Sequence, residues 1–380
     1  MLPMRYVHPS RTRFLANPTQ FGPLCHVGPS TTADSSHQED CLFLNVFAPT
    51  ANTGLHPVFV FFQGGGFNQL SNANLDGNSL INAADYDMVV VSFNYRVSAY
   101  GFLASKEVKA NGDLNAGLLD QRKVLQWVQK YIQLFGGDPK HVTIGGDSAG
   151  GASVDLHLSA YGGRDDGLFH AAAAESQSFG AQLTVEESQY QYDALVQRVG
   201  CDTAAGPVGD TLKCLRELNV SVIAENNINI PTPGGGGGDP LYMYSNVIDG
   251  TFTPDYTYNL FAQGKFVKVP VIFGYVISFS LCLCSHRDSD DTNEGTIFTP
   301  SAINNYTDMN TFLKNNFAKL NASQLAQIDS FYPKAEQFPG MGTYWRTAAN
   351  AYGEMRYICP GIYLSSVFPK YGVLDSWNYQ

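Results

Sequence analysis

The chain has 380 residues, of which 44% are apolar and 13% aromatic, enough for one large α/β domain or for two or three smaller ones. Its net charge is −11 and no basic cluster occurs. Nucleic acid is therefore excluded as the expected partner, and an acidic surface does not favour anionic membranes.

Residues 1–39 are irregular and rich in Pro, Ser, Thr and His. Apolar runs then predict strands at 42–47, 58–62, 88–94, 141–145, 171–176 and 269–274. Helical spacing is found at 118–135, 151–158, most of 184–265, 310–317, 323–331 and 344–357. Alternating strands and helices predict a parallel, doubly wound sheet, and without a repeat or a boundary we expect one domain over 1–380. Five consecutive glycines at 234–238 predict a flexible surface loop.

The stretch 146–150 reads Gly-Asp-Ser-Ala-Gly, the Gly-x-Ser-x-Gly pattern of a nucleophile elbow. A predicted strand precedes it and a predicted helix follows it. The turn would lift Ser148 above the sheet at a helix N-terminus, which favours developing negative charge. We therefore predict that Ser148 is a nucleophile.

Two further segments fit the same chemistry. Gln63-Gly-Gly-Gly-Phe67 follows a predicted buried strand and could offer backbone N–H groups to an oxyanion, although a simple turn is the alternative. Glu294 lies in a loop beyond the strand at 269–274 and is a candidate acid, although by itself it reads as a solvated loop carboxylate.

The seven cysteines include two pairs that lie close in sequence, Cys25 with Cys41 and Cys201 with Cys214. Either pair could close a short disulfide loop, which would suit an oxidising compartment. Cys359 is expected to be a buried free thiol. Asn219, Asn305 and Asn321 begin glycosylation motifs. The N-terminus, however, lacks the apolar region of a signal peptide, so the protein is cytosolic or its natural start is missing.

Several motifs together resemble the type-B carboxylesterases, the family of cholinesterases and fungal extracellular lipases. They lie at 39–46, 64–67, 115–121, 135–139, 146–150 and 293–296, and 174–178 is similar to the fungal branch. The resemblance covers nearly the whole chain. It implies an α/β-hydrolase fold with a mostly parallel sheet flanked by helices.

The resemblance also implies residue roles. Ser148 would form the acyl-enzyme, Glu294 would be the triad acid, and the N–H groups of Gly65, Gly66 and Ala149 would form the oxyanion hole. Cys25–Cys41 and Cys201–Cys214 would be the two loop disulfides of the family. Gln63 departs from the His or Tyr that usually precedes the glycine loop, with little expected cost because the backbone acts there.

Three departures change the expectation for this chain. The family order is serine, acid, histidine, yet all eight histidines precede Glu294. Removing the base of such a triad costs about a millionfold in kcat. We therefore expect a chain truncated at its C-terminus, with at least one strand lost, and nearly inactive. The start also looks shortened, without the export signal and first hairpin of the family.

The third departure is an uncharged, apolar run. Residues 269–285 carry no charge, but they barely reach the length of a membrane span and include Pro270 and Gly274. We interpret 275–287 instead as a retained intron, and we expect no stable membrane span.

The sequence thus predicts a secreted fungal serine esterase or lipase for the intact parent. Its substrate would be a small-molecule or lipid ester, and no metal or organic cofactor is implied. The alternatives are a non-catalytic adhesion or binding module of the same fold and an inactive fragment.

Overall fold

The computed structural model describes residues 21–28, 36–50, 54–202, 210–275 and 294–379. The interpretations placed on the chain start and most of the proposed intron, 276–287, lie outside these residues.

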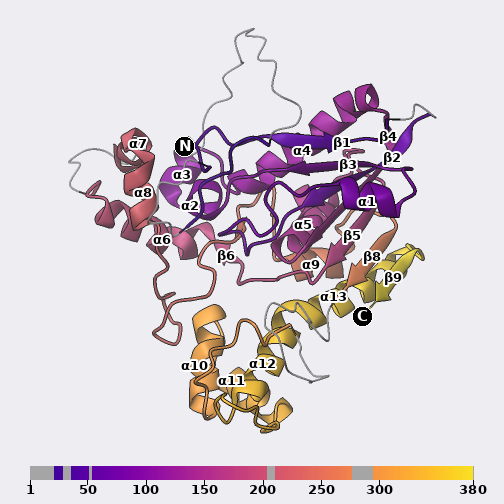
Figure 1. Cartoon of the computed structure of the whole chain (residues 1–380). Helices are drawn as coiled ribbons and strands as arrows, with labels where there is room; N and C mark the ends of the chain where they lie inside the picture. Colours follow the sequence, from indigo (N-terminus) through magenta and orange to yellow (C-terminus); the bar gives the residue numbers. More distant parts are fainter. Residues whose placement is uncertain (1–20, 29–35, 51–53, 203–209, 276–293, 380) are drawn as a thin grey trace.

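The described part is built on a seven-stranded sheet with the order β1-β3-β2-β4-β5-β8-β9 (Figure 1). The strands are β1 (Leu44–Phe47), β2 (His56–Phe62), β3 (Val89–Phe93), β4 (Gly137–Asp147), β5 (Ala171–Glu175), β8 (Val271–Gly274) and β9 (Ser376–Tyr379). Neighbouring strands are parallel except β1, which runs antiparallel to β3. A second, two-stranded sheet pairs β6 (Leu183–Thr184) with β7 (Val247–Ile248).

The register of the central strands brings four strand ends to one edge. Phe62 at the end of β2 is opposite Gly146, while Asp147 is opposite Glu175 and Glu175 opposite Gly274. Because these strands are parallel, the carboxyl ends of β2, β4, β5 and β8 lie side by side. Ligands of open α/β sheets bind at this edge.

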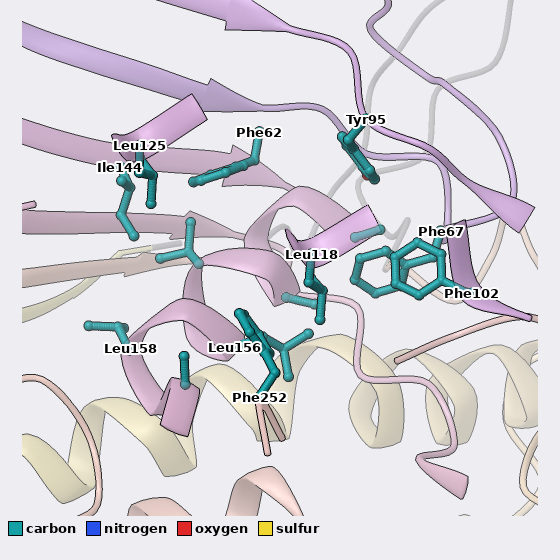
Figure 2. Close-up of a cluster of buried hydrophobic side chains, with 14 of the residues drawn as sticks. Phe62, Phe67, Tyr95, Phe102, Leu118, Leu125, Ile144, Leu156, Leu158 and Phe252 are labelled. Atoms are coloured by element: carbon teal, nitrogen blue, oxygen red, sulfur yellow. The ribbon is translucent and has the colours of Figure 1, made fainter. Parts of the chain in front are cut away.

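Burial differs between the two faces of the sheet. On β2, Val58, Val60 and Phe62 are buried, whereas the alternating Pro57, Phe59 and Phe61 are half-buried. The buried face packs on α4 (Ala116–Tyr131) and α5 (Ala149–Gly163). Figure 2 shows Phe62 and Ile144 in one cluster with Leu156 and Leu158 of α5.

The remaining helices lie around this core. They are α1 (Asn78–Ala83), α2 (Ser98–Phe102), α3 (Lys106–Asn111), α6 (Val185–Arg198), α7 (Asp210–Glu217), α8 (Val220–Asn226), α9 (Thr257–Ala262), α10 (Tyr306–Asn316), α11 (Ala322–Phe331), α12 (Trp345–Gly353) and α13 (Cys359–Val367). A π-helix, Glu354–Ile358, joins α12 to α13. Short 3₁₀ turns follow α4, at Ile132–Phe135, and α13, at Phe368–Tyr371.

Helices α10 to α12 gather at one end of the molecule, below the sheet in Figure 1. They have a hydrophobic cluster of their own, which includes Met309, Leu313 and Tyr352. Among the helices of the described segments, none combines the length and hydrophobicity that a bilayer crossing requires.

The structure contains both disulfides that the resemblance implies, Cys25–Cys41 and Cys201–Cys214. The expectation for Cys359 was wrong, because this free cysteine is exposed at the start of α13. The asparagines of the three glycosylation motifs are the N-caps of α8, α10 and α11, where each side chain accepts a backbone hydrogen bond.

One element prediction needs correction. Strand β4 starts at Gly137 and not at His141, because Gly136 ends the preceding 3₁₀ turn in the left-handed conformation and the N–H of His56 donates to its carbonyl. The strand β9 and the helix α13 were not predicted. The glycine segment 234–238 packs on α10, where the N–H of Gly238 donates to Asn315 Oδ1 over 3.1 Å.

Candidate active site

Ser148 lies at the turn between β4 and α5. Its backbone has φ 54° and ψ −120°, a strained conformation that a residue with a side chain rarely adopts. The turn is fixed from the β5 side: the N–H of Ser148 donates to the Glu175 carbonyl over 2.9 Å, and the N–H of Ser178 donates to the Ser148 carbonyl over 3.0 Å. This is the geometry of a nucleophile elbow.

The two glycines that flank the elbow permit a close approach to β2. A Cβ atom on Gly146 or on Gly150 would collide with the carbonyl oxygen of Phe62. No other residue type could occupy these positions without moving the backbone. The spacing Gly-x-Ser-x-Gly therefore lets the elbow pack against the start of the glycine loop.

The glycine loop is closed by its own turn. The carbonyl of Gly65 accepts from the N–H groups of Asn68 at 3.0 Å and Gln69 at 2.9 Å, and Gly65 and Gly66 have φ values of +110° and +61°. Within the described segments, the N–H groups of Gly65, Gly66 and Ala149 have no hydrogen-bond acceptor. Such donors are available to an oxyanion.

Glu294 lies beyond β8 and is 5% exposed. Its Oε1 accepts a hydrogen bond from the Ser176 hydroxyl over 2.6 Å. Ser176 directly follows β5, and its own N–H donates to the Gly274 carbonyl over 2.8 Å. The sequence analysis did not assign a role to Ser176. The sequence feature that could have identified Ser176 is its position at the carboxyl end of the predicted strand 171–176.

Comparison with known proteins shows the family of the chain. Residues 4–373 match the carboxylesterase family. The chain belongs to that family. It is 36% identical over 348 residues to "Lipase 2" of Geotrichum candidum, covering 87% of this chain and 57% of the lipase. It is 38% identical over 243 residues to "Cholinesterase 1" of Branchiostoma lanceolatum, covering 63% of this chain and 66% of that protein.

A solved structure gives the same result. The crystal structure of Aspergillus niger EstA superposes with a TM-score of 0.87 and 42% identity, covering 95% of this chain and 66% of EstA. The resemblance and the α/β-hydrolase fold predicted from the sequence are thereby confirmed. The chain spans a little over half of the Geotrichum lipase and about two-thirds of EstA.

A Ser-His-acid triad needs an imidazole near its serine, and three of the described histidines have their contacts elsewhere. His56 pairs with Asp87, and His170 Nδ1 accepts from the N–H of Val142. His157 is buried, stacks on Phe62 and contacts Gln121 Oε1 through Nε2. No described histidine forms a hydrogen bond with Ser148, and His8 and His286 lie outside the described residues.

Two acidic residues, Asp147 and Glu175, lie opposite each other at the strand ends beside the elbow. Asp147 accepts from Asn72 Nδ2 over 3.1 Å. Burial raises the pKa of Asp147, and the negative charge of Glu175 raises it further, although the hydrogen bond from Asn72 opposes both effects. Asp147 therefore holds its proton more tightly than an aspartate in water does.

A cavity of about 260 Å³ adjoins the glycine loop at Gly66. Four tyrosines contribute to its wall in the described part of the chain, Tyr190, Tyr242, Tyr244 and Tyr256. The ring of Tyr242 packs directly over Gly66, so that a Cβ on this glycine would meet the ring. A mostly apolar cavity with a few polar groups is the usual form of a small-molecule site.

Proposed function

We propose that this chain carries the core of a carboxylic-ester hydrolase that forms an acyl-enzyme on Ser148. The observation that carries the proposal is the strained elbow of Ser148 beside three backbone N–H groups without an acceptor. The hydroxyl would attack the ester carbonyl. The oxyanion would then accept hydrogen bonds from Gly65, Gly66 and Ala149.

Glu294 is proposed as the triad acid, oriented by the hydroxyl of Ser176. In such a triad the acid holds an imidazole, which takes the serine proton. Because none of the described histidines bonds to Ser148, we propose that these 380 residues alone turn over esters far more slowly than a complete esterase does. A loss on the order of a millionfold in kcat corresponds to removal of the base.

The substrate class would be a small-molecule or lipid ester. This is supported by family membership and by the names of the relatives, which include a "Secreted lipase 4" of Gibberella zeae. That relative and the two disulfides also support an extracellular location, because disulfides persist in oxidising compartments.

A fluorophosphonate probe tests the nucleophile directly. The purified chain should be labelled at Ser148, slowly, and the Ser148→Ala variant should not be labelled. Ser153→Ala is a matched control, since Ser153 is buried one helical turn further on and its hydroxyl donates to the Ala149 carbonyl. Labelling that survives in Ser148→Ala would contradict the proposal. Hydrolysis of p-nitrophenyl esters at the rate of a complete esterase would show that another base serves.

A further inference from the structure

Arg356 is a buried cation in the wall of the cavity beside the glycine loop. Only 4% of the residue is exposed, and its guanidinium lies near Gly180, where a Cβ would be 3.5 Å from Nη2. Its Nε donates to Ser178 Oγ over 2.8 Å. The N–H of Ser178 in turn bonds to the carbonyl of Ser148, so Arg356 is two contacts away from the elbow.

The surroundings of this arginine are aromatic. Its guanidinium carbon is 5.2, 5.8 and 5.9 Å from the ring centroids of Tyr242, Tyr352 and Tyr357. No aspartate or glutamate in the described residues forms an ion pair with it. Buried arginines are almost always paired with an anion, because removing an uncompensated charge from water is costly.

The charged side chains in the cavity wall are positive, although the protein as a whole is acidic. The chain carries a net charge of −11, yet among the described residues no carboxylate lines the cavity, and the two charged residues in that part of its wall are Arg356 and Lys319. Lys319 already has a partner, since its Nζ is 2.8 Å from Glu187 and also donates to the Tyr256 hydroxyl. Arg356 is thus the cation of this wall that an anionic ligand could still pair with.

We propose that the cavity binds a carboxylate through Arg356, and that the esters taken at this site carry a free carboxylate group besides the ester bond. The guanidinium presents planar paired donors that match a carboxylate, and the tyrosine rings bury the apolar part of the ligand. The claim that the ligand is an ester that the protein hydrolyses rests on the proposed function. Binding of the carboxylate does not, because it requires no turnover.

The test compares two ligands of equal shape, 3-phenylpropanoate and 3-phenylpropanamide, by isothermal titration calorimetry on the full chain. We expect the carboxylate to bind at least about tenfold more tightly, which corresponds to about 1.4 kcal/mol. The preference should disappear in Arg356→Gln. It should persist in Lys319→Gln, which removes the other cation of the same wall.

Equal affinity for the two ligands, or binding of neither, would overturn the inference, and so would a preference that survives in Arg356→Gln. If Arg356→Gln does not fold, the wild-type comparison and the Lys319→Gln variant still decide. A preference that is lost in Lys319→Gln would show that Lys319, and not Arg356, binds the carboxylate, and would overturn the inference. Labelling of Ser148 separates this inference from the proposed function. Labelling without a carboxylate preference refutes only the inference, whereas a preference without labelling refutes only the hydrolase.

Discussion

Asp155 offers a sharp test of the structure because it is a buried carboxylate without a partner. It lies on α5, seven residues after Ser148, and is 0% exposed. Neither of its carboxylate oxygens has a hydrogen-bond partner among the described residues. Burial therefore raises its pKa well above the ordinary aspartate value.

The sign of the effect follows from proton binding. Above the pKa of the unfolded state, near pH 4, the unfolded chain has released the proton of Asp155, while the native chain keeps it up to its raised pKa. The native state binds more protons in this window, so stability falls as pH rises. The loss is about 1.4 kcal/mol per pH unit, and it ends at the native pKa.

Replacing Asp155 with asparagine removes this titration while keeping the shape of the side chain. Relative to the wild type, the free energy of unfolding of Asp155→Asn should rise by about 1.4 kcal/mol for each pH unit between about 4 and the native pKa of Asp155. Urea unfolding at about pH 4.5, 5.5 and 6.5 measures the difference, in which the titrations common to both proteins cancel. The control is Ser159→Ala on the same helix, which removes a buried hydroxyl that does not titrate and should give a difference independent of pH. A pH-independent difference for Asp155→Asn as well would refute the reasoning.

Two further predictions concern the site and its supports. Ser176→Ala removes the hydrogen bond to the buried carboxylate of Glu294 and should lower the free energy of unfolding by about 1.5–3 kcal/mol, as measured by urea unfolding. Replacing both Cys201 and Cys214 with serine opens a loop with a sequence separation of 13 residues, which should lower stability by about 3 kcal/mol and reduce Tm in a calorimetric scan.

Each of these has its own control. Ser366→Ala removes an exposed hydroxyl that donates to the Tyr363 carbonyl over 2.7 Å, and it should change stability by less than about 0.5 kcal/mol. An equal effect of the two serine variants would show that the contact with Glu294 is not special. The control for the disulfide is partial reduction of the wild type. When Cys201–Cys214 is reduced and Cys25–Cys41 stays intact, the loss of stability should equal that of the double variant. A double variant as stable as the oxidised wild type would contradict the loop-closure argument.

The sequence by itself determined the elements that are encoded locally. The apolar runs that became β2, β3, β5 and β8 are readable because strands buried in a parallel sheet need uninterrupted apolar side chains. The elbow is readable because only glycine tolerates the approach of Phe62 on both sides of Ser148. The paired cysteines were also apparent, although their pairing came from family resemblance.

Tertiary structure decided what depends on segments far apart in the chain. Ser176 and Glu294 are 118 residues apart, and they meet because β5 and β8 are neighbours in the sheet. Arg356 faces the cavity at the glycine loop because the π-helix after α12 packs beside Ser178. The short strand β9 forms by pairing with β8, without a local pattern that announces it. Local propensity fixes elements, but hydrogen bonds and burial between distant segments choose which side chains share a site.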